Sequence, residues 1–262
     1  MKLFLILSFA IIWSSCKTIT ALEKMQAESA NADIWINNDK IVIFVPMSHV
    51  GRSSFYEDVK NIIADAKKDS FIIYYEGAQM GDCTYSIIQQ LKEKNYVKKF
   101  YKGVADPDSI CMDTYKRKMR RLTGIGIDST GYARYLHEKG IFKNLVDQPK
   151  PEALGITNSD MRVDITQIEL VNIYEKLYGE ISLYQLDYAI SLNDIYNYPR
   201  GHTLPKKQVG SVIIDFRNKY LAEYILQSPD KKIVVIYGAA HKKGVFRELK
   251  EKDSSWRSKK IK

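Results

Sequence analysis

Three apolar runs rich in β-branched residues stand out along the chain, and each ends abruptly on a polar, chemically reactive residue. Continuous runs of this length are typical of strands buried on both faces of a parallel sheet. The runs are 41–45, which leads through Pro46-Met47-Ser48 to His49; 71–75, which leads to Glu76; and 233–237, which leads through Gly238-Ala239-Ala240 to His241.

The segments around these runs show helical and turn patterns. Asn37-Asn38-Asp39 is typical of a turn, so residues 33–40 are expected to form a strand and turn that pair as a hairpin with the strand at 41–45. Ser53 or Ser54 is expected to cap a helix that runs to about Lys68, with apolar residues on one face. This strand–helix–strand order predicts a βαβ unit and therefore parallel pairing.

The middle of the chain is rich in helical patterns. Helices are predicted at 84–99, 113–121, 166–178 and 183–196. Residues 144–147 are a short strand candidate, and 124–128 are a short strand candidate or a turn. A long helix at 210–227 precedes the strand at 233–237, and a last helix is expected at 245–252. The predicted fold is α/β, with a central, mostly parallel sheet flanked by helices and a helix-rich middle insertion. One domain is expected over 33–252, followed by a basic tail at 253–262.

The N-terminus has the pattern of an export signal. Lys2 precedes an apolar run of about a dozen residues and then Ser14-Ser15-Cys16. We expect a signal peptide at 1–15, lipidation of Cys16, and a tether at 16–32, which predicts attachment to the bacterial cell envelope through an N-terminal lipid. A plain secretory signal and an uncleaved anchor are the alternatives, although the run is short for a membrane span of about 20 residues.

Charge and cysteines narrow the class of protein. The net charge of +9 is spread along the chain, and an exported protein is not expected to bind nucleic acid. A solvated surface is the favoured interpretation of this charge, with attraction to anionic lipid headgroups as the alternative. Cys83 and Cys111 either form a disulfide, which export permits, or remain separate thiols.

The polar strand ends predict a site, because ligands of open α/β sheets bind at the carboxyl ends of the strands. Two imidazoles and a carboxylate, those of His49, His241 and Glu76, suit a divalent metal ion that keeps one position open for water. The alternative for each histidine is a hydrogen-bonded core or rim residue. The sequence shows no nucleophile elbow, P-loop or dinucleotide-binding motif that would indicate other chemistry.

Arg217 interrupts an apolar helix face, since its neighbours at three- and four-residue spacing include Ile213, Tyr220 and Leu221. A buried guanidinium requires a partner, and Glu76 or a substrate anion would serve. The alternative is a structural ion pair, or an arginine whose head reaches out of the face to solvent.

At these residues the chain resembles the TraB/PrgY/GumN family, which includes the Tiki metalloproteases. Gly238-Ala239-Ala240-His241 resembles its second G-x-x-H motif, Tyr75-Glu76-Gly77 its glutamate segment, and Phe216-Arg217-Asn218 its arginine segment. The segment ending at His49 matches the first motif only at the histidine, because Pro46 replaces the glycine. In the middle of the chain, Asn158-Ser159-Asp160 matches a polar segment of some relatives.

The resemblance implies an α/β fold of the erythromycin-esterase/ChaN-like group and metal-dependent hydrolysis of a peptide or another small substrate. It implies His49, Glu76 and His241 as metal-site residues, with Glu76 as a ligand or the general base and Arg217 neutralising Glu76 or holding the substrate. The alternative function is an envelope lipoprotein that binds a peptide or haem without catalysis. A purely structural envelope role is the third interpretation.

Overall fold

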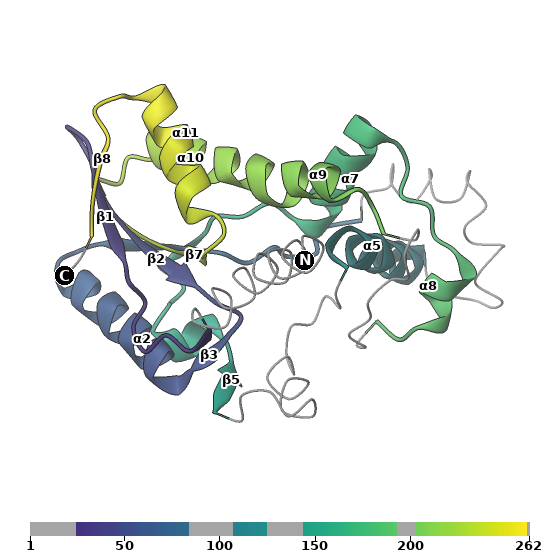
Figure 1. The fold of residues 1–262 in the computed structure, drawn as a ribbon, viewed down its shortest axis with the longest axis horizontal. Helices are drawn as coiled ribbons and strands as arrows, with labels where there is room; N and C mark the ends of the chain where they lie inside the picture. Colours follow the sequence, from purple (N-terminus) through teal and green to yellow (C-terminus); the bar gives the residue numbers. More distant parts are fainter. Residues whose placement is uncertain (1–24, 84–106, 125–143, 193–202, 261–262) are drawn as a thin grey trace, which may run out of the picture.

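The computed structural model describes residues 25–83, 107–124, 144–192 and 203–260 (Figure 1). The expected signal peptide, Cys16, the predicted helix at 84–99 and most of the strand candidate at 124–128 lie outside these ranges. Within them, no helix is both long enough and apolar enough to cross a membrane.

A six-stranded sheet forms the centre of the fold, in the order β6-β4-β7-β2-β1-β8. The pairs β2–β7, β7–β4 and β4–β6 are parallel, whereas β1 is antiparallel to both β2 and β8. The predicted α/β class with a mostly parallel sheet is therefore confirmed. The strands are β1 Asp33–Ile36, β2 Ile41–Met47, β4 Ile72–Tyr75, β6 Met161–Arg162, β7 Lys232–Gly238 and β8 Arg257–Lys260.

Helices cover both faces of this sheet (Figure 1). Helix α2, Ser53–Lys68, packs with alternate strand residues such as Val45 and Val234 in one core. Helices α10, Arg217–Gln227, and α11, Lys242–Lys252, pack on the opposite face with Phe44 and Val235. Both faces are buried, which explains why the strand sequences are apolar throughout.

The predicted hairpin between β1 and β2 is confirmed. The side-chain Oδ1 of Asn37 accepts hydrogen bonds from the backbone N–H groups of Asp39 and Lys40, at 3.0 and 2.7 Å. The predicted serine cap of α2 is wrong. Arg52 occupies the N-cap position without a side-chain cap, because the chain passes directly from β3, Val50–Arg52, into the helix.

Both ends of the domain differ from the expected boundaries. The predicted basic tail contains β8, which pairs with β1, and Trp256, which is 1% exposed. Trp256 stands among basic residues, and the composition of this segment therefore indicated a solvated tail instead of a strand. At the other end, part of the expected tether packs on the domain, because Ala30 and Ala32 are buried.

The middle of the chain contributes helices α5, Pro107–Thr123, α7, Gln167–Tyr178, and α8, Gln185–Ala189. The predicted helices at 113–121 and 166–178 are confirmed, and Thr166 and Glu169 form a capping box at the start of α7. The helix expected at 183–196 is shorter than predicted: α8 ends at Ala189, and Ile190 has extended backbone, while 193–196 lie outside the described residues. Strand β5, Leu145–Asp147, pairs with β3 in a separate two-stranded sheet, and η1, Pro151–Leu154, follows it.

The helix predicted at 210–227 is one long helical segment with three parts. It consists of α9, Lys206–Gly210, a π-helical stretch η2, Ser211–Phe216, and α10. In Figure 1 it runs from the middle helices α5 and α7 to the sheet. A third core, with Leu122, Val171 and Val212 among its members, holds the middle helices together.

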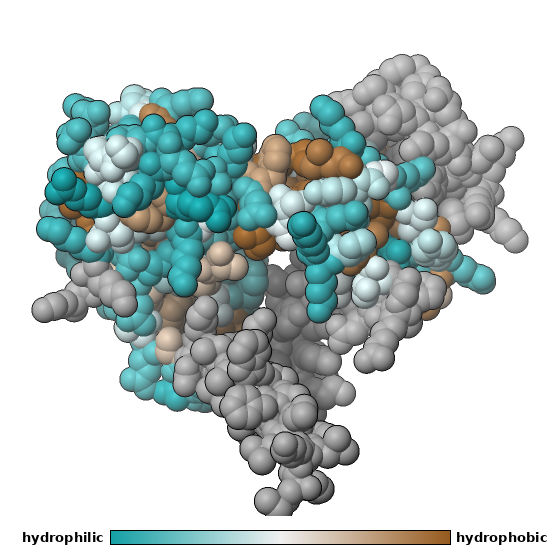
Figure 2. Space-filling view, turned by 45° about the horizontal axis from the view of Figure 1, so that its top comes forward, coloured by the Kyte–Doolittle hydropathy of each residue, from teal (hydrophilic) through white to brown (hydrophobic). Residues whose placement is uncertain are grey.

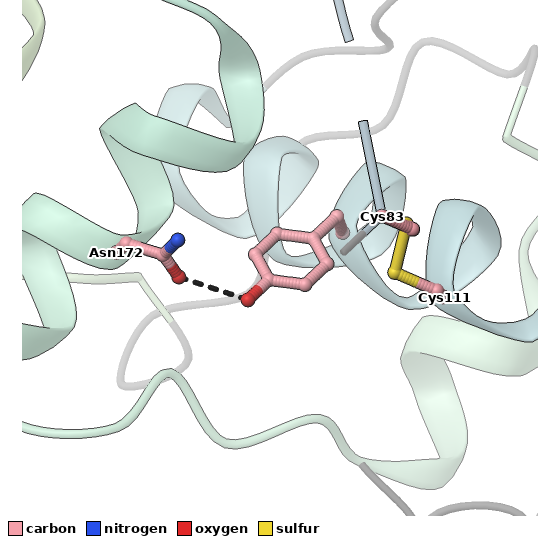
Figure 3. Close-up of a disulfide and its surroundings, with 4 residues drawn as sticks. Cys83, Cys111 and Asn172 are labelled. Atoms are coloured by element: carbon pink, nitrogen blue, oxygen red, sulfur yellow. Dashed lines mark hydrogen bonds between the residues drawn. A yellow bond between two sulfur atoms is a disulfide. The ribbon is translucent and has the colours of Figure 1, made fainter. Parts of the chain in front are cut away.

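Cys83 and Cys111 form a disulfide with a Cα–Cα distance of 6.3 Å, which resolves the two alternatives left by the sequence (Figure 3). The bond ties the segment that follows β4 to helix α5. Beside it, the hydroxyl of Tyr115 donates to Oδ1 of Asn172 on α7 at 2.8 Å. The middle helices are thus attached covalently to the carboxyl edge of the sheet.

Candidate functional site

A cluster of buried polar side chains lies at the carboxyl ends of β6, β4 and β7. Glu76 directly follows β4, Asp164 lies two residues after β6, and His241 follows the short turn that ends β7. Arg217, the first residue of α10, is aimed at all three. We call these four residues the Arg217 cluster.

Arg217 is the centre of the cluster. Its Nη2 donates to Oε1 of Glu76 at 2.6 Å and to Oδ2 of Asp164 at 2.7 Å, while its Nε donates to Oδ1 of Asp164 at 2.9 Å. Its Nη1 lies 3.3 Å from Nε2 of His241. Burial alone would lower the pKa of Arg217, but Glu76 and the other neighbouring groups raise it above its ordinary value. The guanidinium is therefore permanently charged, and the predicted pairing with Glu76 is confirmed.

Asp164 is the cluster residue that the sequence did not reveal. Its side chain is 0% exposed and accepts hydrogen bonds from the Tyr237 hydroxyl at 2.8 Å and the Gly77 backbone N–H at 3.0 Å. A signal was present, because Asp164 stands between the buried apolar residues Val163 and Ile165. A lone acid in so short an apolar segment indicates a buried partner.

Glu76 also depends on the turn after β7. Its Oε2 accepts a hydrogen bond of 2.5 Å from the backbone N–H of Gly238. A Cβ atom at position 238 would lie 3.0 Å from that oxygen, so glycine permits the close approach. With a side chain 20% exposed, Glu76 is the more accessible of the two carboxylates.

His241 is held as a neutral imidazole. It is 3% exposed, and its pKa is lowered to about 4 by burial and then by the nearby Arg217 charge. Since Oδ1 of Asn218 lies 2.8 Å from Nδ1, we assign the proton to Nδ1. The unprotonated Nε2 then accepts from Arg217, and the edge of the ring meets Tyr237 with centroids 4.9 Å apart.

Two features of the helical segment around Arg217 position this residue in the cluster. The π-helical stretch η2 immediately precedes Arg217, and such stretches often occur at functional sites. On α10, Arg217 shares the buried face with Leu221 and Ala222, as the apolar pattern predicted. With Arg217 charged, His241 neutral and two carboxylates, the cluster has a formal charge of −1.

The expected metal does not fit this arrangement. His241 directs Nε2 at a guanidinium that also contacts Glu76, and this positive charge would repel a cation placed between the two side chains. His49 is exposed between β2 and β3, and its side chain makes none of the hydrogen bonds of the Arg217 cluster. Across the described ranges, no group of three His, Cys, Asp or Glu side chains could hold a metal ion. His241 and Glu76, two of the three expected metal ligands, thus lie close together, but they contact Arg217 in place of a metal ion.

Comparisons with family models, with curated proteins and with solved structures found no match.

Proposed function

We propose that this chain is an exported, lipid-anchored hydrolase of the bacterial cell envelope, with the Arg217 cluster as its reactive centre. The proposal follows the TraB-like resemblance of the sequence and the fold group that it implies. The observation that carries it is the convergence of Glu76, Arg217 and His241, which the resemblance singles out and which lie on separate elements of the fold.

The cost of burying these groups supports a functional role. Two carboxylates and a guanidinium lose hydration when they are buried, and an apolar core of the same volume is often as stable or more so. Perturbed ionisable groups at strand ends are typical of functional sites. The lowered pKa of His241 and its contact with Arg217 are features of this kind and support the proposal.

The chemistry that these residues offer is general-base hydrolysis. Glu76 would take a proton from water, the resulting hydroxide would add to the substrate carbonyl carbon, and the proton would pass to the leaving group as its bond to that carbon breaks. Arg217 has five N–H groups, of which four are used in the hydrogen bonds described. The fifth, on Nη1, would stabilise the carbonyl oxygen as it becomes negative.

The other two members would position these groups. Asp164 fixes the guanidinium through two hydrogen bonds, and neutral His241 accepts from Nη1. No step is assigned to a metal ion, because the donor atoms do not fit one. The resemblance implies a peptide or another small substrate, and a peptide or an ester would supply the carbonyl carbon that this step requires.

The test is hydrolysis of a panel of nitrophenyl esters and fluorogenic peptides by the chain without its signal peptide. Glu76→Gln is expected to lower kcat by about a hundredfold or more. Glu251→Gln, an exposed carboxylate on α11, is the control and should retain activity. Turnover that survives in Glu76→Gln would contradict the proposal, and activity that depends on added Zn²⁺ or Mn²⁺ would restore the metal hypothesis.

A further inference from the structure

A second feature at the carboxyl edge of the sheet is a cavity of about 600 Å³ between the ends of β2 and β7. The Arg217 cluster does not line it. Its walls come from the segment that precedes β1, from β1 itself, from the end of β2, from the turn after β7, and from α2, α11 and β8. Representative lining residues are Ala30, Trp35, Met47, Ala240, Lys243 and Phe246.

The cavity lies at the carboxyl ends of two neighbouring parallel strands, β2 and β7. Strand β2 leads into α2 on one face of the sheet and on toward β4, whereas β7 leads into α11 on the other face and on toward β8. The two neighbouring parallel strands therefore send their connections to opposite faces of the sheet, and each connection passes across the other strand. Ligands of open α/β sheets bind outside the carboxyl ends of the strands, in pockets of about 300–1,000 Å³.

The charged residues of the cavity wall favour an anion. They are Asp33, Lys242 and Lys243, with a formal sum of +1. Lys242 is paired with Oδ2 of Asp33 at 2.9 Å. Lys243 is exposed and has no ion-pair partner within the described part of the chain. It is therefore available to an acid group of a ligand.

Asp33 adds an independent signal. Its Oδ1 is buried and has no hydrogen-bond partner among the described residues. A buried acceptor without a donor is costly. Since the Asp33 side chain as a whole is 13% exposed, a turn of its carboxylate would present this oxygen to an O–H or N–H group of a ligand. The rest of the wall is largely apolar and includes the aromatic rings of Trp35, Phe55 and Phe246. Figure 2 shows, by contrast, a mainly hydrophilic face over the sheet-bearing part of the molecule.

We infer that this cavity binds a small amphipathic acid: an apolar body against the aromatic wall, a carboxylate near Lys243 and a hydroxyl or amide donor to Asp33. This inference is independent of the proposed hydrolysis, because it concerns different residues and requires no reaction. Medium-chain hydroxy acids have all three features, and 3-hydroxydecanoate is a suitable probe.

The test is calorimetric titration of the chain without its signal peptide with 3-hydroxydecanoate, decanoate and 1-decanol. Saturable 1:1 binding is expected, tightest for the hydroxy acid and weakest for the alcohol. Lys243→Glu should weaken binding of both acids several-fold and leave decanol unchanged. Lys250→Glu, at an exposed position on the same helix, should bind the acids as the parent does.

A second variant tests the cavity itself. Ala240 is exposed at the rim, so Ala240→Phe can add volume there without disturbing the core, and it should abolish binding of all three probes. Far-UV circular dichroism checks that each variant is folded. Failure of every probe to saturate would overturn the inference. Equal affinity for decanol and the acids, unaffected by Lys243→Glu, would overturn the assignment of an acid ligand.

Discussion

At the scale of single residues, Arg217 supplies the positive charge that stabilises the buried Asp164 and the partly buried Glu76. Arg217→Met keeps much of the side-chain volume but leaves Glu76 and Asp164 without their counter-charge. Breaking a buried ion pair by removing one partner costs about 3–5 kcal/mol. We expect a loss of this size in the free energy of unfolding, measured by urea denaturation at pH 7.

A matched arginine provides the control. Arg247 lies on α11 with a side chain 57% exposed, and its ion pairs are on the surface. Arg247→Met should change the free energy of unfolding by no more than about 0.5 kcal/mol. Equal effects of the two substitutions would mean that the Arg217 cluster is not a buried ion-pair network.

His241 predicts a specific pH dependence. Its folded-state pKa of about 4 lies below the ordinary value of 6.5, so the unfolded chain binds the proton first as the pH falls. The stabilising contribution is therefore complete above about pH 6.5 and is lost as the pH falls toward 4, by about 3 kcal/mol in total. The charged and titratable groups that face the ring are Arg217, Glu76, Asp164 and Tyr237.

NMR titration of the histidine ring protons measures this directly. The chain has four histidines, and one ring should titrate near pH 4 and disappear from the spectrum of His241→Gln. In that variant the decline of unfolding free energy between pH 6.5 and pH 4 should be shallower than in the parent. A ring of His241 that titrates near 6.5 would contradict the buried, neutral imidazole.

At the scale of elements, the sequence predicted the strands, turns and helices that are specified by residues close together along the chain. The three apolar runs, the Asn37 turn and the helical pattern at 166–178 each specify their structure within a few residues, and all three features are present. The serine cap of α2 failed because tertiary pairing of β3 with β5 carries extended backbone directly up to Ser53. Likewise, β8 is defined by its partner β1, more than two hundred positions away.

The same distinction applies to the Arg217 cluster. The pairing of Glu76 with Arg217 was predictable, because a guanidinium on an apolar face needs a carboxylate and Glu76 ends an apolar strand. The place of Asp164 was not, since nothing local specifies that β6 lies next to β4. His49 was assigned to the site from its position after a strand, but β3 follows within one residue and leaves it exposed.

The contact between α10 and α11 gives a prediction at this scale. A Cβ atom on Gly244 would lie 2.0 Å from Nδ2 of Asn218, the residue that accepts from His241. Gly244→Ala should therefore destabilise the fold by about 1–3 kcal/mol through overpacking, although alanine is normally the better helix former.

Gly210 is the control for Gly244, because it is helical and a Cβ atom there would meet nothing within 4 Å. Gly210→Ala should raise the free energy of unfolding by up to about 1 kcal/mol. Opposite signs for the two glycines, measured by thermal and urea unfolding, are the expected result. A gain in stability at Gly244 would show that the two helices are not packed this closely.

At the scale of the whole molecule, the disulfide connects the sheet to the middle helices. The two cysteines are 28 residues apart, and closing a loop of this length stabilises a fold by about 3–4 kcal/mol. Replacing both by serine should lower the free energy of unfolding by about that amount. Reductant should affect the parent and not the double variant; an identical response of the two would mean that the bond is absent.

The C-terminus tests whether the domain ends at the last helix or at the last strand. A chain that ends at Lys252 loses Trp256, which is buried in the core beneath α10 and α11, and loses β8, which covers the edge of β1. Removing a buried tryptophan alone costs about 3–5 kcal/mol, and the exposed edge of β1 would promote association. We therefore expect a lower free energy of unfolding, and oligomers in size-exclusion chromatography.

A chain that ends at Lys260 keeps both features and should behave as the parent does. Equal stability of the two shortened chains would mean that residues 253–260 are the solvated basic tail that their composition suggests, and that Trp256 contributes nothing to the core.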